Sequence, residues 1–296
     1  MLHPTLYQLL SQKRKRMNKI QKSLPMDKGF QWQFPYAIEK SLATLIEERT
    51  REVLTPYLSY IRSNGDIGVR VDQSYEDLDQ YSYQYQQFVQ SQENDEKEDN
   101  KLILLYASLY LFNRKELFRF TNNLIGIDFE GNNVWNDGQE RLFMKLAQSE
   151  IRKNVIQFIE RLRIIMIRDS VRKKTWKETW ETIQSKTIDF YEKKLPLIAR
   201  NMVGNAFSFM QRNMLSVLGI NFYRWKTAGD EAVRKTHRPL EGKICRWDNA
   251  SLYSTDGVTW QEKTNDMVKK HPSEDYNCRC VALPHLKNEI KEIDNK

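Results

Sequence analysis

Residues 137–172 read DGQERLFMKLAQSEIRKNVIQFIERLRIIMIRDSVR. Apolar side chains recur in this stretch at intervals of three or four residues, which is the repeat of one face of an α-helix. The members of this apolar series are Phe143, Ala147, Ile151, Val155, Ile159, Leu162 and Met166. The pattern predicts one helix of about 35 residues, long enough to bridge two parts of the molecule.

Helical patterns also dominate the chain on both sides of this segment, up to about residue 220. Further helices are expected at about 36–56, 101–124, 176–193 and 197–218. Pro56 is expected to kink or end the first of them, because proline lacks the backbone N–H. Residues 75–92 are rich in Tyr and Gln and have weak helical periodicity. Just before them, Val69 and Val71 could form one short strand.

The pattern changes after Gly219. The stretch up to Leu286 holds all three cysteines, three of the four histidines and three of the seven tryptophans, and glycine and proline split its short apolar runs. This favours a compact module of short strands and loops. The expected fold is therefore mainly α, a long-helical body with a small C-terminal α+β module. The expected divisions are a basic N-terminal arm at 1–35, a helical body at 36–220 with an acidic loop near 93–100, the module at 221–286 and a charged tail at 287–296.

The composition excludes several classes of protein. The 34 aromatic residues among 296 (13 Phe, 14 Tyr and 7 Trp) provide ample surface for a packed core, which argues against a disordered chain. The longest apolar run, residues 102–112, is too short to span a membrane. No signal peptide is expected, because a basic cluster follows the brief apolar patch near the N-terminus. Three cysteines form no disulfide framework and suit a reducing compartment.

The charge is distributed in blocks. In total, 47 Lys and Arg against 39 Asp and Glu give +8. Residues 1–30 carry seven basic residues against one acid, residues 64–100 two against ten, and residues 151–200 thirteen against six. Each block can be a solvated helix face. The N-terminal block is also typical of basic arms that contact nucleic-acid phosphates.

Two clusters in the module contain residues suited to chemistry. The first runs from Trp225 to Gly242, and the second from His271 to Cys280. On a helix, Asp230, Arg234 and His237 would share a face, with Asp230 pairing Arg234. Thr227 and Asp230 have the spacing of a helix capping box. Arg234 and Arg279 are expected to anchor Asp230 or other carboxylates of the module.

The thiols and imidazoles of these clusters allow three interpretations. His237, His271, Cys278 and Cys280 could form a tetrahedral zinc site, with Cys245 as a fifth candidate ligand. Alternatively, the cysteines pack as small buried side chains while His237 and Asp230 orient the backbone. A Cys278 nucleophile with a histidine base is the third interpretation. The sequence has no GxSxG, P-loop, HExxH or Rossmann glycine pattern to support an enzyme.

The run WKTAGDEAVRKTHRPLEGKI, followed by HPSEDYNCRCVALP, resembles the C-terminal signature of the phage minor head proteins. This is the head-morphogenesis family typified by the Mu F protein and the minor head protein of tailed Bacillus phages. The residues that carry the resemblance are Trp225, Thr227, Asp230, Arg234, His237, Gly242, Pro272, Cys278, Arg279 and Cys280. Family members often have Arg-Thr-Glu where this chain has Arg200, Asn201 and Met202.

The resemblance implies a virion or procapsid component, assembled in the host cytoplasm and acting in head assembly, DNA packaging or DNA delivery. Its implied partners are the portal protein, the major capsid or scaffolding protein, and double-stranded DNA bound without sequence specificity. The residues expected to contact DNA phosphates are Lys13, Arg14, Lys15, Arg16, Lys19, Lys22, Arg172, Lys173 and Lys174. The alternatives are a metal-dependent nuclease that uses Asp230, His237 and His271, and a nucleic-acid-binding module without a virion role.

Overall fold

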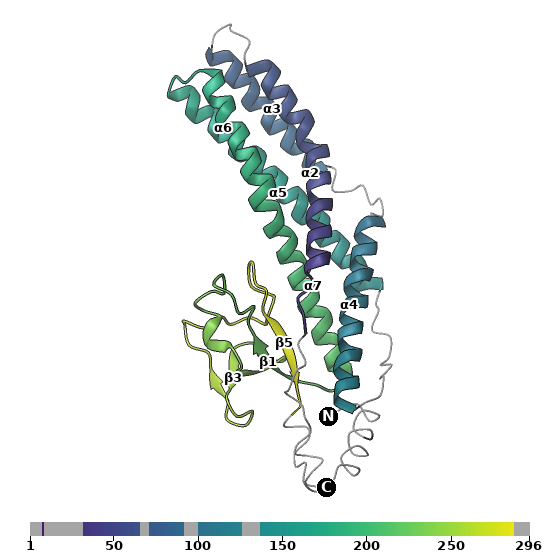
Figure 1. Cartoon of the computed structure of the whole chain (residues 1–296). Coiled ribbons are helices and arrows are strands. Elements are labelled where there is room, and N and C mark those ends of the chain that lie inside the picture. The colour runs from purple at the N-terminus through teal and green to yellow at the C-terminus, as the bar shows by residue number, and fades with distance from the viewer. Residues whose placement is uncertain (1–7, 9–31, 66–70, 92–99, 126–136, 287–296) are drawn as a thin grey trace. The chain divides into compact units, whose positions relative to one another are not determined.

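The computed structural model describes residue 8 and residues 32–65, 71–91, 100–125 and 137–286. In chain order the elements are α2 Tyr36–Gly65, α3 Val71–Ser91, α4 Asn100–Ile125, α5 Asp137–Val171, α6 Trp176–Asp189, the π-helical turn η2 Phe190–Lys194, α7 Leu195–Val217, β1 Phe222–Lys226, the 3-10 turn η3 Arg238–Leu240, β2 Ile244–Arg246, β3 Leu252–Ser254, β4 Gln261–Glu262 and β5 Val281–His285 (Figure 1). The predicted fold class, mainly α with a small C-terminal α+β module, is confirmed.

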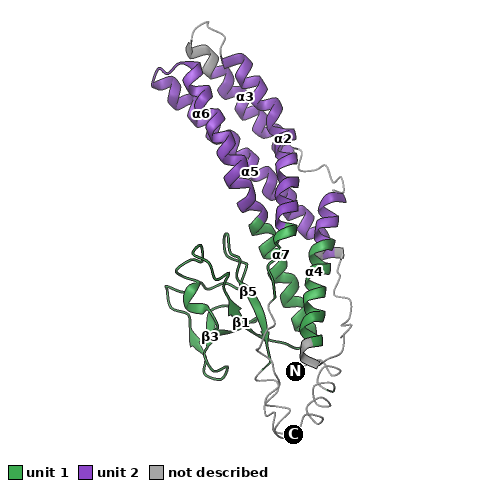
Figure 2. Ribbon diagram, in the orientation of Figure 1, with its two compact units in different colours: residues 1–38, 107–136, 200–296 green, residues 39–106, 137–199 purple. Residues whose placement is uncertain are grey.

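The chain divides into two compact units, coloured separately in Figure 2. One unit comprises residues 39–106 and 137–199, and the other comprises residues 1–38, 107–136 and 200–296. Residues 200–217 of α7 thus group with the C-terminal module. The division near residue 220 that the sequence favours stays a prediction.

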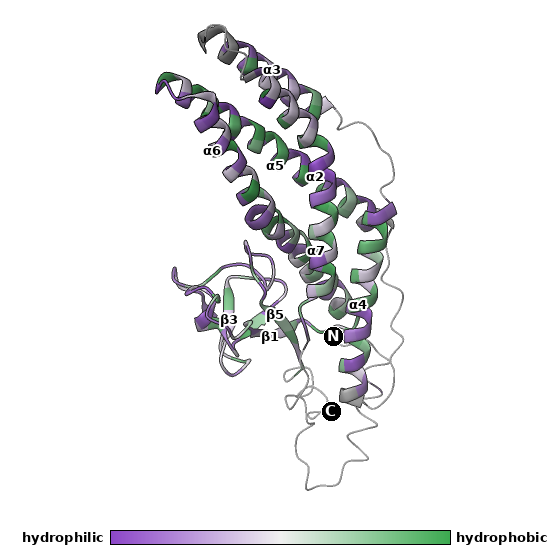
Figure 3. Cartoon of the chain, turned by 45° about the horizontal axis from the view of Figure 1, so that its top comes forward, coloured by the Kyte–Doolittle hydropathy of each residue, from purple (hydrophilic) through white to green (hydrophobic). Residues whose placement is uncertain are grey.

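The helical unit is organised around α5, where the predicted apolar series forms the core. Six of the seven members are buried, namely Phe143, Ala147, Val155, Ile159, Leu162 and Met166, and Ile151 is half-buried. Polar contacts join α5 to α3: Arg163 donates from Nη2 to Oδ2 of Asp79 over 3.1 Å, and Gln86 donates to Glu160 over 2.9 Å. Figure 3 shows hydrophobic and hydrophilic residues alternating along the helices, as amphipathic packing requires.

Pro56 does not end α2, which continues to Gly65. The two residues that follow Pro56 by one and five positions, Tyr57 and Ile61, are fully buried. Tyr57 also shares a hydrogen bond of 2.8 Å with Ser82 on α3. Tertiary packing on this face therefore outweighs the loss of one helical hydrogen bond at proline.

The prediction of a short strand at Val69 and Val71 is wrong for Val71, because α3 begins there. Val69 lies outside the described residues. Residues 75–91 form a helix although their apolar periodicity is weak. The periodicity is weak because the buried positions, Leu78, Ser82 and Val89, include a small polar residue that a hydrophobicity pattern does not count. The acidic run 93–99 also lies outside the described part of the chain.

The two helices expected at 176–193 and 197–218 are joined by a π-helical turn rather than by a loop. α6 begins at the predicted place, with Thr175 and Glu178 forming a capping box. The widened turn lies directly before Pro196, whose ring would clash with the carbonyl four residues earlier in a regular α-helix. No helix among the described residues combines the length and the apolar character needed to cross a membrane.

The C-terminal module contains a five-stranded antiparallel sheet in the order β4-β3-β2-β1-β5. The interior strand β1, which lies between β2 and β5, buries Tyr223 and Trp225 completely. α7 is attached to the edge strand β5, where Gln211 donates to the carbonyl of Ala282 over 2.7 Å. Most of the expected functional residues lie on the loops that follow β1 and precede β5.

Candidate functional site in the C-terminal module

The loop after β1 is built from turns and the short η3, not from the α-helix expected around Asp230 and His237. The expected capping box is also wrong, because Thr227 donates from both its backbone N and its Oγ1 to Glu241 Oε2, over 2.6 Å and 2.5 Å. Lys226 holds the other oxygen of Glu241 at 2.8 Å. Burial alone would raise the pKa of Glu241, but these hydrogen bonds lower it. Glu241 therefore closes the base of the loop.

Two glycines allow the backbone geometry around this loop. Gly242 ends the loop with φ of +74°, a conformation that other residues rarely adopt. Its N–H donates to the carbonyl of Trp225 over 2.8 Å, which joins the two ends of the loop. Gly204 on α7 is required for a different reason, because a Cβ there would lie 2.7 Å from the carbonyl oxygen of Ser273. The second loop therefore packs directly against the helix backbone.

The expected pairing of Asp230 with Arg234 is wrong. Asp230 instead receives both terminal nitrogens of Arg279, at 2.9 Å and 2.7 Å, and the guanidinium holds the pKa of this carboxyl below its usual range. Arg234 pairs with Asp275 at 2.7 Å. The prediction that Arg234 and Arg279 anchor carboxylates of the module is confirmed. Both pairs join the loop after β1 to the loop before β5.

Asp275 connects three basic groups and was not predicted from the sequence. It accepts from His237 Nε2 over 3.1 Å and from Arg234 on one oxygen, and from Lys270 over 3.0 Å on the other. Burial alone would raise the pKa of Asp275, but the bonds from Lys270 and His237 lower it, so the carboxylate is charged. No spacing rule could find it, because Asp275 lies 38 residues from His237.

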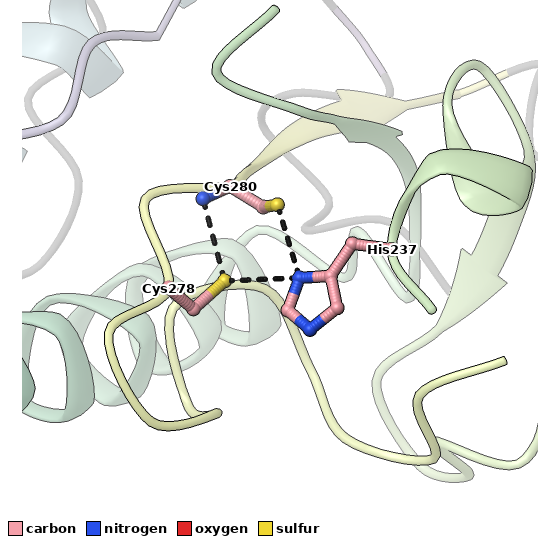
Figure 4. A group of neighbouring side chains, drawn as sticks. All are labelled: His237, Cys278 and Cys280. Atoms are coloured by element: carbon pink, nitrogen blue, oxygen red, sulfur yellow. Dashed lines mark hydrogen bonds between the residues drawn. The ribbon is translucent and has the colours of Figure 1, made fainter. Parts of the chain in front are cut away.

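His237, Cys278 and Cys280 meet in a buried cluster (Figure 4). The Nδ1 atom of His237 lies 3.5 Å from each of the two Sγ atoms. The backbone N–H of Cys280 also points to Sγ of Cys278, over 3.4 Å. Hydrogen bonding with Cys280 and His237 lowers the pKa of the Cys278 thiol, and the neighbouring Cys278 together with burial raises that of Cys280. One thiolate beside one thiol is thus the favoured state of the pair.

His271 lies apart from this cluster, although the sequence grouped it with the other three candidate ligands. Its Nδ1 bonds to the hydroxyl of Tyr223 at 3.0 Å, and its ring lies 5.2 Å from that of Trp247. Burial is the largest cause that lowers the pKa of His271, to about 4. The remaining cysteine, Cys245, lies beside Tyr223, and burial raises its pKa to about 11. The four-ligand set expected from the sequence is therefore reduced to three.

The loop before β5 is fixed to α7 by Arg200 and Asn201. Asn277 has φ of +53°, and its backbone N–H donates to Oδ1 of Asn201 over 2.6 Å. Arg200 donates to the side-chain oxygen of Asn277 over 2.6 Å. Ser273, with φ of +68°, donates to the carbonyl of Cys280 over 2.6 Å. These bonds hold Cys278 and Cys280 in position.

The remaining predicted residues fall in three places. Trp225 lies on β1, with its ring centroid 5.8 Å from that of His237, and Pro272 is buried in the loop before β5. Arg172 and Lys173 are exposed after the end of α5, whereas Lys174 pairs with the buried Asp169 at 3.4 Å. The other DNA-contact candidates, Lys13, Arg14, Lys15, Arg16, Lys19 and Lys22, lie outside the described residues.

Comparison with known proteins identifies what this module is similar to. Residues 150–283 match the family model described as Phage Mu protein F like protein. An uncharacterized protein of Haemophilus influenzae (strain ATCC 51907 / DSM 11121 / KW20 / Rd) is 30% identical over 104 residues, which are 35% of this chain and 20% of that relative. The chain thus spans about a fifth of the relative's length. No solved structure matches the chain significantly.

Proposed function

Because residues 150–283 match the model of the Phage Mu protein F like family, we propose that this chain acts in phage head morphogenesis as a minor head protein. One observation carries the proposal: the matched segment contains the whole signature, and the structure gathers most of the signature residues in two facing loops. Paired side chains hold these loops together, with Asp230 on Arg279 and Arg234 on Asp275. The module is a fixed structural unit, suited to binding a protein partner.

The proposed location is the virion or procapsid, with assembly in the host cytoplasm. The proposed protein partners are the portal and the major capsid or scaffolding protein. The test is to purify procapsids and virions and to quantify this chain relative to the portal. We expect a few copies per particle, with incorporation lost when the module is disrupted. Absence from both kinds of particle would refute the proposal and favour a DNA-binding module without a virion role.

Contact with packaged DNA forms the second part of the proposal. Basic side chains collect around the groove between α5 and α6, where Arg161, Arg168, Lys186 and Lys194 are among the lining residues. Arg172 and Lys173 are exposed just beyond α5. Clusters of this kind bind phosphates without reading the base sequence. The DNA would thus be held by charge alone.

The experiment for DNA contact compares two double variants that remove the same charge. Arg172→Gln/Lys173→Asn alters exposed residues, and asparagine tolerates the φ of +54° at residue 173. The control is Arg49→Gln/Arg51→Gln, where each arginine pairs with a glutamate on its own helix. Affinity for duplex DNA should fall steeply with salt, and the first variant should reduce the slope by about one per lost phosphate contact. Equal slopes for both variants would refute contact at this site.

The alternative of a metal-dependent nuclease requires Asp230, His237 and His271 around one ion. Asp230 instead faces Arg279, and His271 bonds to Tyr223. Neither belongs to the group of possible metal ligands around His237. We therefore propose a structural role and no catalysis. Plasmid cleavage by the purified chain with Mg²⁺, Mn²⁺ or Zn²⁺, lost in His237→Ala, would overturn this choice.

A further inference from the structure

The geometry of the buried cluster matches a tetrahedral metal site. A zinc ion with Zn–S of about 2.3 Å and Zn–N of about 2.0 Å places its N and S ligand atoms about 3.5 Å apart. The distances from Nδ1 of His237 to Sγ of Cys278 and to Sγ of Cys280 are both 3.5 Å. Two edges of a zinc tetrahedron are therefore already present among these side chains.

The groups around the cluster are those that support a metal ligand. Histidines that bind a metal through one ring nitrogen usually donate from the other to a carboxylate, which fixes the tautomer. Here Nε2 of His237 faces Oδ2 of Asp275 at 3.1 Å, so the proton lies on Nε2 and the lone pair of Nδ1 points toward the thiols. The N–H of Cys280 directed at Sγ of Cys278 likewise favours a thiolate.

We propose that His237 Nδ1, Cys278 Sγ and Cys280 Sγ bind one Zn²⁺ ion, with Asp275 positioning the imidazole. Two thiolates and one imidazole form a donor set typical of zinc. Among the described residues no fourth His, Cys, Asp or Glu joins this group, and water would fill the fourth position. Both cysteines would bind as thiolates, with any proton still present on a thiol released to solvent, and no oxidation is required.

The ion would join two segments that are far apart in the sequence. His237 lies in the loop after β1 and directly precedes η3, and Cys280 directly precedes β5. β1 and β5 are neighbours in the sheet, so the metal would fix the loops at one end of this strand pair. The strands of the sheet are two to five residues long. A small module of this kind gains much of its folding energy from a metal.

The first measurement is the zinc content of the full chain, purified under reducing conditions without chelator. One zinc per chain is expected. The matched controls are Cys245→Ser and His271→Gln, a buried cysteine and a buried histidine outside the cluster, and both should retain the metal. Cys278→Ser and Cys280→Ser should lose it, whereas His237→Cys should retain it because thiolate can replace imidazole as a ligand.

A second measurement does not depend on the folding of variants. X-ray absorption of the zinc-loaded parent should give two sulfur ligands, with the remaining ligands nitrogen or oxygen. Asp275→Asn should weaken zinc binding about 10- to 100-fold without removing a direct ligand. No zinc in the parent after exposure to Zn²⁺, or a Cys278–Cys280 disulfide in its place, would overturn the proposal. Loss of zinc in Cys245→Ser with retention in Cys278→Ser would also overturn it. These outcomes are independent of whether the chain is found in phage particles.

Discussion

His271 is expected to make the module less stable as the pH falls from 7 to 5. The residue is 6% exposed, its Nδ1 shares a hydrogen bond with the hydroxyl of Tyr223, and its pKa is about 4 against 6.5 for a free histidine. Burial is the main cause, and the positive charges of Arg212 and Lys263 act in the same direction, while Asp248 acts against them. The folded state therefore favours the neutral form of the His271 ring.

The size of the effect follows from the two pKa values. Between pH 7 and pH 5 the unfolded chain gains most of a proton at this residue, while the folded chain gains very little. Stability therefore falls with falling pH, by about 2 kcal/mol over this interval and by about 3 kcal/mol once the pH is below 4. His237 acts in the opposite direction, because its pKa is raised in the folded protein by Cys278 and Asp275 against the effect of burial.

The assay compares the parent with His271→Gln by chemical denaturation at pH 7 and at pH 5. Glutamine keeps an acceptor for the hydroxyl of Tyr223 but does not titrate in this range. The contributions of His237, the carboxylates and any bound metal are common to both proteins and cancel in the difference. The parent should lose about 2 kcal/mol more than the variant between the two pH values. Equal losses would show that the ring is not held neutral by burial.

Three further substitutions test the packing of each unit. Ile159→Ala removes a fully buried side chain of α5 and should cost about 2–5 kcal/mol in denaturation, whereas Ile164→Ala, at 54% exposure on the same helix, should cost far less; similar costs would mean that the core is misplaced. Gly65→Ala puts a Cβ 2.1 Å from the ring of Trp176 and should lower stability by about 1–3 kcal/mol, so an unchanged melting temperature would contradict this contact. Lys263→Met replaces a buried ammonium that donates to the carbonyl of Lys270 over 3.5 Å, and the change should leave stability equal or higher. A loss of more than about 1 kcal/mol in the free energy of unfolding would contradict this expectation.

The helices could be predicted from the sequence because their cause is local. Apolar residues three and four positions apart in residues 137–172 specify the buried face of α5 whatever the rest of the chain does. The same rule failed at Val71, where a short β-branched sequence lies at the start of a helix whose core includes the polar Ser82. The expectation that Pro56 could end the helix was wrong for a related reason, since tertiary burial of Tyr57 favours continuation of α2.

The site could be predicted only as a set of residue types. His237, Cys278 and Cys280 were predicted as candidate ligands together with His271, which lies apart from them. A helical wheel placed Asp230 and Arg234 together, although their partners are Arg279 and Asp275. Both pairings cross more than 40 residues and depend on turns with positive φ at Ser273 and Asn277. Periodicity contains no information on such contacts, because the turn at Asn277 is fixed by hydrogen bonds to α7 and the turn at Ser273 by a bond to Cys280 and by close packing on Gly204.

The structure also changes how the basic block at residues 151–200 should be interpreted. Its thirteen basic residues against six acids suggest a strongly positive surface. Several of these cations are paired: Arg163 with Asp79, and Arg168 and Lys174 with the fully buried Asp169. Under the proposed DNA contact, removing Lys174 would weaken binding through lost stability as well as lost charge, so this change would not be diagnostic. Arg172 and Lys173 are exposed. Neutralising them therefore removes positive charge without the loss of stability that breaking the ion pair of Lys174 would cause.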